Sequence, residues 1–484
     1  MKRAKWIFVL WMLVLTAPVK AQEMWGAAHS NYAGQMGIDL NPASIVDAPY
    51  KWELHFLSMD VGFVNNYMLL QRNSRLIRNS FQDKTTEKEK FTDRYRKTPN
   101  KAGYLSAFAK YPAFIWSDQK WGAAFHISTR AELSANKIPY HLAKYLKEGF
   151  DYDLQQNNRY TVKDAKAAMA AWHEFGLTFG KLLYESKTDY WSAAATVNYN
   201  YGLDGFFLNI DDADYIVPAD TLLIVNNINA TYGHAFPDNS ANSVDGPLAN
   251  RGNGFSTTVG VQYFKNRNDA FFDPCKRGKG EKPYDYRIGF SLMDFGYIRF
   301  NKGARTYRFD NNSTDWYGID TTSFNGFMYT DSILSSNFYG NRTGSRDQFG
   351  FTVFTPAAAS LQFDYAFSEN LFVNATIIQR IPLGPISIRR TNQIAITPRF
   401  ESRRFEFSIP FSYYEFFRPR LGVALRYGIF TIGSDMLSPL LGFTDSYGAD
   451  VFFGITWKNY GKCGRRNKGS GGVRSIEKCL DGNK

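Results

Sequence analysis

Ten charged residues stand inside segments that otherwise alternate apolar and polar side chains. Their carboxylates and guanidiniums could line a selective path for a ligand, or they could pair with one another and rigidify an interior. The second role is favoured, because charges held away from water usually pair. The set consists of Arg130, Glu132, Glu174, Arg287, Asp364, Arg380, Arg399, Arg404, Glu406 and Arg426.

Other chemistry finds little support in the sequence. The six histidines are scattered without an HExxH or comparable pair, and neither a GxSxG elbow nor a P-loop is present. Two groups rich in Asp and Asn, at 211–214 and 310–315, lack EF-hand spacing and are typical of turns. We therefore expect no enzymatic activity, no catalytic residues, no metal and no cofactor.

The three cysteines, Cys275, Cys463 and Cys479, fall outside the alternating segments. In an oxidising compartment, which the N-terminal segment described below implies, one disulfide can form. Three single pairings are possible, and the sequence does not choose among them.

The elements that hold the charges show a period of two. Leu361, Phe363 and Tyr365, for example, alternate with Gln362 and Asp364. Such alternation indicates strands with one apolar and one polar face. About fourteen strands are expected, most of them close to the 9–11 residues that a tilted membrane strand needs. They start near Lys51, Gly103, Trp121, Trp172, Tyr190, Gly254, Tyr284, Ala358, Leu371, Thr391, Arg404, Leu421, Ile429 and Ala449.

The expected connections alternate between long and short. The long ones are about 71–102, 135–170, 203–253 and 299–356, and the tight ones lie near 117–120, 186–189, 368–370 and 401–403. Long loops on one side and short turns on the other are typical of transmembrane β-barrels. The sequence therefore predicts an all-β chain forming a single transmembrane antiparallel β-barrel; a secreted β-sandwich is the alternative that alternation alone would also fit. A long connection at 266–283, on the short-turn side, is the exception.

The N-terminus has the order of a secretory signal peptide. Basic Lys2, Arg3 and Lys5 precede an apolar run from Trp6, and a small residue, Ala21, closes the segment. We expect export to the cell outer membrane and four parts: signal peptide 1–21, a periplasmic or plug segment 22–50, the barrel 51–460, and a basic periplasmic tail 461–484.

The formal net charge of +12 is concentrated in two segments. Segment 71–102 holds ten Lys or Arg against four Asp or Glu, and the tail holds seven against two. A basic external loop could contact lipopolysaccharide as well as membrane lipid, although a solvated loop is the simpler interpretation. Nucleic acid is not expected as a partner, since no nucleic-acid-binding motif appears.

The element Asn41, Pro42 and Ala43, before the first strand, resembles the Asn-Pro-Ala element of FadL-like barrels. The segments 287–296, 354–363, 419–426 and 448–454 resemble an uncharacterised family of Bacteroidota outer-membrane barrels related to FadL. The resemblance implies a fourteen-strand barrel whose N-terminal segment enters it as a plug, and it carries no settled activity. PorV- and PorP-type barrels are more distantly similar.

Two functions follow as hypotheses. The favoured one is passive transport of small hydrophobic compounds, which predicts an apolar pocket near Asn41 and Pro42 and a lateral gap in the wall. The alternative is a scaffold or shuttle for secreted or surface proteins, related to type IX secretion or gliding, which predicts a sealed barrel. Fold resemblance alone does not decide between them.

Overall fold

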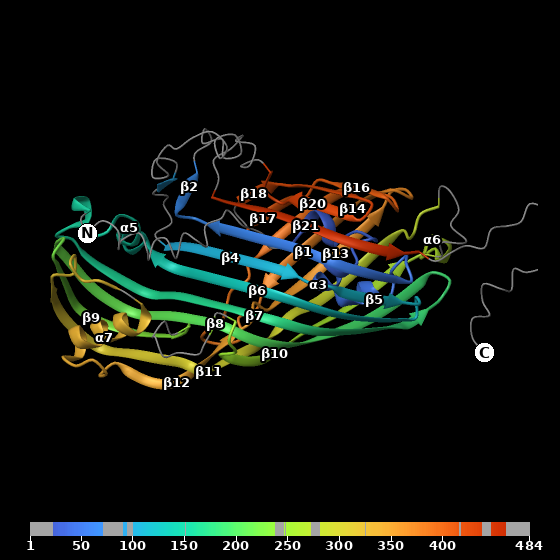
Figure 1. Cartoon of the computed structure of the whole chain (residues 1–484). Helices are drawn as coiled ribbons and strands as arrows, with labels where there is room; N and C mark the ends of the chain where they lie inside the picture. Colours follow the sequence, from blue (N-terminus) through green and yellow to red (C-terminus); the bar gives the residue numbers. More distant parts are fainter. Residues whose placement is uncertain are drawn as a thin grey trace, which may run out of the picture.

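The computed structural model describes residues 23–70, 91–93, 100–150, 152–237, 246, 248–272, 281–324, 326–415, 418–437 and 447–460. These residues form a closed barrel of fourteen antiparallel strands, as expected (Figure 1). Closure comes from the last strand, which pairs with the first from Trp52↔Asn459 to Leu57↔Ile455. No helix in the described part of the chain is long and apolar enough to span a membrane.

Three barrel strands are each divided in two by short interruptions. All but one of the expected strands begin within about three residues of the expected start; the exception starts at Arg159 rather than near Trp172. The strands in order are β1 (Trp52–Asn65), β4 with β5 (Asn100–Lys110, Ala113–Ser117), β6 (Trp121–Pro139), β7 (Arg159–Glu185), β8 (Asp189–Ala219), β10 (Gly252–Lys265), β11 (Tyr286–Tyr317), β13 (Ala358–Ala366), β14 (Leu371–Arg380), β15 (Gln393–Glu401), β16 with β17 (Phe405–Ser408, Phe411–Tyr414), β18 with β19 (Arg418–Leu421, Val423–Tyr427), β20 (Phe430–Ser434) and β21 (Gly448–Asn459).

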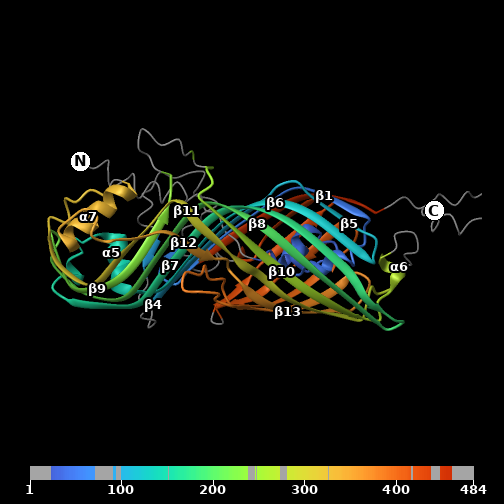
Figure 2. The ribbon, with the colours of Figure 1, turned by 90° about the horizontal axis from the view of Figure 1, so that it is seen from below.

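At one end, which we call the turn end, short turns join β5 to β6, β7 to β8, β13 to β14 and β15 to β16. At the other, the extended end, the structure corrects the sequence-based loops. Much of 135–170, 203–253 and 299–356 is regular, because β7, β8 and β11 continue beyond the barrel and keep their backbone groups paired (Figures 1 and 2). The added elements are β2 (Met68–Leu70), β3 (Phe91–Asp93), α5 (Tyr140–Glu148), η4 (Asp153–Gln155), β9 (Leu222–Ala235), α7 (Phe327–Tyr339) and β12 (Arg346–Phe354).

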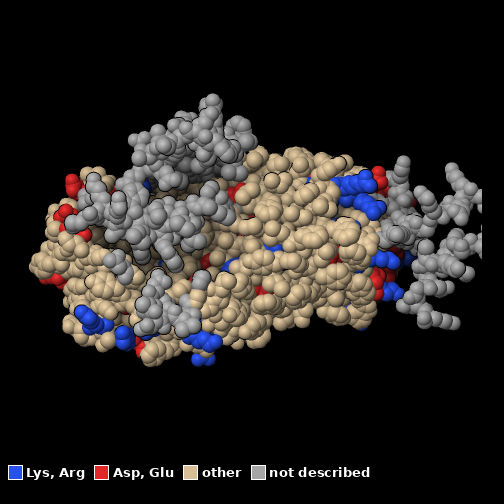
Figure 3. Space-filling model, viewed as in Figure 1, with Lys and Arg blue, Asp and Glu red and all other residues tan. Residues whose placement is uncertain are grey.

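Side chains in the barrel alternate between the outer surface and the lumen. On β13, Leu361 and Phe363 are 51% and 44% exposed, whereas Gln362 and Asp364 between them are 7% and 1% exposed. On the face that Figure 3 shows, the outward residues form a band with few charged side chains, and most Lys, Arg, Asp and Glu lie toward the two ends. Such a band suits lipid, because an outward Arg at mid-bilayer would cost roughly 2–4 kcal/mol.

The chain from Glu23 to Tyr50, which we call the inner segment, lies inside the barrel near its turn end (Figure 2). It contains α2 (Trp25–Ala28), α3 (Gln35–Leu40) and η1 (Pro42–Ile45). The turn into η1 is local: Asn41 Oδ1 accepts the backbone N–H of Ala43, and Pro42 fits the first helical position because it needs no donor there. Ile38, Ala43 and Ile45 are almost fully buried.

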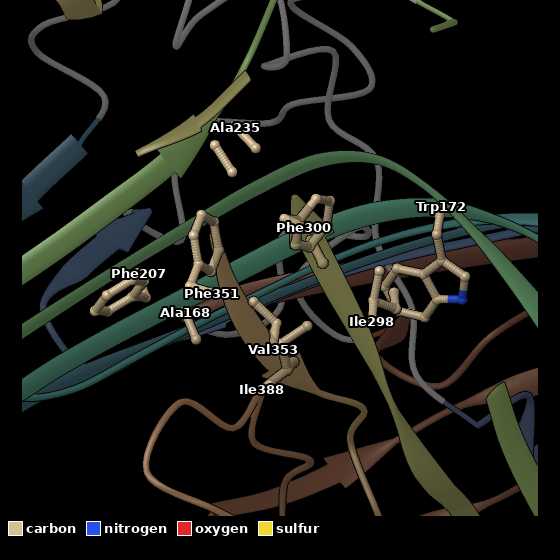
Figure 4. Close-up of a cluster of buried hydrophobic side chains, with 11 residues drawn as sticks. Ala168, Trp172, Phe207, Ala235, Ile298, Phe300, Phe351, Val353 and Ile388 are labelled. Carbon is tan, nitrogen blue, oxygen red and sulfur yellow. The ribbon is translucent and has the colours of Figure 1, made fainter. Parts of the chain in front are cut away.

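A cluster of apolar side chains closes the lumen toward the extended end. Phe300, Phe351, Val353 and Ile388 pack together there, with Trp172 at the edge of the group (Figure 4). Ile388 belongs to the connection 381–392, which folds inward so that the Arg389 N–H donates to Ser134 Oγ, 3.0 Å away. We call this group the apolar cap.

Candidate functional site

The Asn41-Pro42-Ala43 element fastens the inner segment to the wall. Asn41 Nδ2 donates to Gln362 Oε1 on β13 (2.9 Å) and to the backbone oxygen of Val261 on β10 (3.2 Å). Gly260 makes this approach possible, since a Cβ there would lie 2.1 Å from Asn41 Oδ1. The element therefore has a structural role that its spacing alone did not show.

The cavity beside Asn41 differs from the apolar pocket that the transport hypothesis predicts there. The cavity at Asn41 measures about 20 Å³, and polar side chains, including His29, Gln362 and Asn374, make up much of its lining. The reason is the fastening itself, because the amide of Asn41 needs polar partners in the wall.

Near the turn end, charged residues of the wall hold the inner segment. Arg399 is almost fully buried and binds Asp364 through two bonds of 2.5 and 2.8 Å, and Glu401 at 3.0 Å. Glu401 accepts the backbone N–H of Asn31, and Arg287 donates to the backbone oxygen of His29 at 2.8 Å.

Beside this cluster, Arg426 binds Glu406 at 2.9 Å, and Glu406 accepts the hydroxyl of Ser30 at 2.7 Å. The wall charges of β11, β13, β15, β16 and β19 thus serve as partners for one another and for the inner segment. Arg380, at the end of β14 that is farther from the turn end, pairs with Glu415 at 2.9 Å.

A second network surrounds Arg130 in the middle of the lumen. Arg130 lies 3.2 Å from Glu132, 3.2 Å from Glu174 and 3.1 Å from Asp294. Arg390, from the connection 381–392, binds Asp294 and, at 2.9 Å, Glu23 of the inner segment. The network therefore joins strands β6, β7 and β11 to both the inner segment and the inward-folded connection.

This network borders a cavity of about 100 Å³, which we call the acidic cavity. It lies between the inner segment, the wall and the connections that carry Pro356 and Arg390. Its lining is Glu23, Met24, Met36, Ile38, Asp39, Leu40, Asp60, Ser106, Phe108, His126, Arg130, Glu132, Glu174, Thr196, Asn198, Thr258, Asp294, Pro356 and Arg390.

Sequence reasoning missed several of these residues. Asp294 turns inward because β11 bulges there, with a φ of 53° and a register shift against β10, so that Met293 and Asp294 are both buried. Arg390 lies in a connection, where alternation has no meaning. Asp60 lies on β1, where it and Ser58 alternate with apolar residues. The alternation of the sequence could therefore have placed Asp60 in the lumen.

One expected lumen charge is placed elsewhere. Arg404 is exposed in the turn between β15 and β16, because the strand begins only at Phe405. Cys275, Cys463 and Cys479 lie outside the described residues, as do the signal peptide, the basic tail and most of segment 71–102. The Asp- and Asn-rich groups belong to paired strands, where Asp214 binds Arg159 and Asn311 bonds with Asn229.

The seam between the first and last strands is uneven. Ser58 to Asn65 of β1 register with β4, from Ser58↔Lys110 to Asn65↔Gly103. The register of β1 with β21 stops at Leu57↔Ile455, so within these two described strands Ser58 to Val64 have no registered partner on β21. Asp60, which lines the acidic cavity, lies in this stretch.

Beyond the barrel, a histidine links α5 to the extended strands. His141 Nδ1 lies 2.8 Å from the hydroxyl of Tyr215, and its ring stacks on Tyr160 at 4.3 Å. Burial lowers the pKa of His141, and the hydrogen bond to the Thr161 backbone oxygen partly offsets this. Burial therefore favours the neutral imidazole.

Comparison with known proteins gives a family. A family of unknown function, DUF5723, matches residues 42–435, which include Pro42 and Ala43, Arg130 with its partners on the strands, and most of the wall. The chain belongs to this family. No curated protein matches it.

The similarities of this chain to solved structures are distant. The chain is similar to a TodX deltaS2S3 mutant monoaromatic hydrocarbon channel (10% identity, TM-score 0.40, 89% of this chain and 95% of that chain). It is similar to the toluene transporter TbuX of Ralstonia pickettii (9%, 0.39, 92% and 95%) and to a Pseudomonas aeruginosa FadL homologue (11%, 0.38, 91% and 99%).

Proposed function

We propose that this protein is an exported outer-membrane barrel that lets small hydrophobic compounds cross passively and has no enzymatic activity. The observation that carries the proposal is the place of Asp60. It lines the acidic cavity and also lies in the stretch of β1 that lacks a registered partner on β21. A compound in the cavity is therefore next to a part of the wall where β1 and β21 have no registered residue pairs.

Energetics favour this sideways exit over an axial one. The described inner segment is joined to the wall by more than ten hydrogen bonds and ion pairs, such as Asp39 with Lys110 and Ser192 with Asp47. At about 1 kcal/mol net for each, its release would cost on the order of 10 kcal/mol, an open fraction near 10⁻⁷. Separating β1 from β21 between Ser58 and Val64, where no residue pairs are registered, breaks far fewer bonds.

Entry from the extended end requires the apolar cap to open, because Phe300, Phe351 and Ile388 are only 0%, 8% and 3% exposed. The lining of the acidic cavity adds further apolar side chains, such as Met24 and Phe108. A hydrophobic compound gains roughly 25 cal/mol for each Å² that it removes from water on such surfaces.

The test is a disulfide across the seam. Extending the register Leu57↔Ile455 by two residues places Met59 opposite Phe453, so the pair Met59→Cys and Phe453→Cys should lock the two strands. The control pair, Leu361→Cys with Ile377→Cys, crosses a fully registered seam between β13 and β14.

Uptake of N-phenyl-1-naphthylamine into vesicles that contain lipopolysaccharide is the assay. We expect the oxidised β1–β21 pair to lose most protein-dependent uptake, reduction to restore it, and the control pair to keep it. Unchanged uptake with the β1–β21 disulfide formed would refute lateral passage.

A scaffold for secreted or surface proteins, related to type IX secretion or gliding, is the second candidate. The observation that favours it is apolar surface beyond the membrane band, where Phe349 is 90% and Tyr317 75% exposed. If Phe349→Ser releases a copurifying secreted protein while uptake stays unchanged, the scaffold function is supported.

A further inference from the structure

The acidic cavity holds more carboxylates than guanidiniums. Glu132, Glu174 and Asp294 all share the guanidinium of Arg130, and Asp294 also shares Arg390 with the inner segment. Because each guanidinium carries one positive charge, these pairings leave the cavity with unbalanced negative charge. A buried site of this kind attracts a cation.

Three side chains point to where such a cation would bind. Within the described part of the chain, Asp60 Oδ1, His126 Nδ1 and Asn198 Oδ1 have no hydrogen-bond partner, and these residues are only 5%, 3% and 4% exposed. All three line the acidic cavity. Asp60 also has no ion-pair partner among the described residues, although a buried carboxylate normally requires one.

Two of these groups converge on one point. A Cβ on Gly176 would lie 2.1 Å from His126 Cε1 and 2.4 Å from Asn198 Oδ1. The two side chains therefore occupy the space over a residue that has no side chain of its own. A residue with a Cβ at position 176 would displace both acceptors.

The rest of the lining sets the size and polarity of the ligand. Met24, Met36, Leu40 and Phe108 supply apolar surface beside the carboxylates. A dry cavity of about 150 Å³ accommodates benzene, so a cavity of about 100 Å³ suits roughly four heavy atoms. An ammonium group offers three donors and a positive charge, which match the unpaired acceptors and the excess of carboxylates.

We propose that the acidic cavity binds a short alkylammonium ion, its ammonium group on Asp60, His126 and Asn198 and its alkyl chain on the methionines. This binding differs from the proposed transport, because it concerns retention of the ion in the acidic cavity and not its passage through the seam. A short alkylammonium ion suits this cavity because its lining combines carboxylates with apolar side chains.

Calorimetric titration of the full-length folded barrel in detergent tests the proposal. The probes are n-propylammonium chloride, 1-propanol of the same size, and sodium and calcium chloride at equal ionic strength. We expect propylammonium to bind at least about tenfold more tightly than propanol, because hydrogen bonds to charged groups exceed neutral ones by this factor or more. Equal affinity for propanol, or binding of calcium in place of the amine, would overturn it.

Two variants locate the site. Asp60→Asn should weaken propylammonium about tenfold without changing propanol, whereas Asp347→Asn, whose carboxylate pairs with Arg308 at the extended end, should leave both unchanged. If Asp60→Asn does not fold, Asn198→Leu removes another acceptor and should also weaken the amine. An undiminished affinity in a folded variant at position 60 would refute the assignment, and the wild-type comparison with propanol requires no variant at all.

Discussion

Replacing Arg399 by Met should destabilise the barrel strongly. The guanidinium and the carboxylate of Asp364 are each only 1% exposed, and Glu401 is its second partner. Removing the cation leaves two buried carboxylates without their main partner, which typically costs 3–5 kcal/mol. Against a total stability of about 5–15 kcal/mol, that is a large fraction.

Urea unfolding in lipid vesicles, followed by tryptophan fluorescence, measures the cost. Arg308→Met is the control, because Arg308 pairs with Asp347 at the surface with its side chain 49% exposed, and such pairs contribute about 0–1 kcal/mol. The double variant Arg399→Met with Asp364→Met should be more stable than Arg399→Met alone, since it removes a stranded charge. If Arg399→Met costs no more than the control, or the two substitutions simply add, the buried network does not hold the lumen as described.

Three further outcomes are expected. Gly260→Val should push Asn41 off the wall and raise single-channel conductance in planar bilayers, whereas Gly246→Val, with no atom of the described residues within 4 Å of its Cβ position, should not. The folded-state pKa of His141 is lowered, so its contribution to stability is present above about pH 6.5 and lost as pH falls through the folded value; protease resistance of α5 should drop at low pH, and His141→Gln should remove that dependence. Asp331→Leu should loosen α7 by about 2–4 kcal/mol, because the buried carboxylate binds both His234 and Tyr232 at 2.9 Å; hydrogen exchange of α7 measures this, and unchanged exchange would contradict it.

The alternation of apolar and polar residues along the sequence determined the strands of the barrel wall. A strand in lipid must show apolar side chains outward and satisfy its backbone through its neighbours, so strand number and facing are written locally. That is why Asp364, Arg399 and Glu406 could be placed inside from their neighbours alone. The prediction for Arg404 was wrong because the strand begins one residue later than the alternation indicated.

Beyond the lipid, alternation of apolar and polar residues no longer identifies a strand. β7, β8 and β11 continue into water, where both faces tolerate polar residues, so segments such as 211–214 resemble turns although they are paired strands. The lipid, which requires apolar side chains on the outer face of the barrel strands, is absent there.

The tertiary structure alone decided which charges meet. Asp294 enters the lumen through a bulge, Arg390 through an inward-folded connection, and Asn41 finds Gln362 more than three hundred residues away. No local pattern encodes such pairings, because a buried charge is satisfied by whichever partner the closed barrel brings opposite it. The sequence by itself determined a barrel with charges inside; closure of the barrel around the inner segment determined that these charges hold a segment in place and leave an acidic cavity beside the seam.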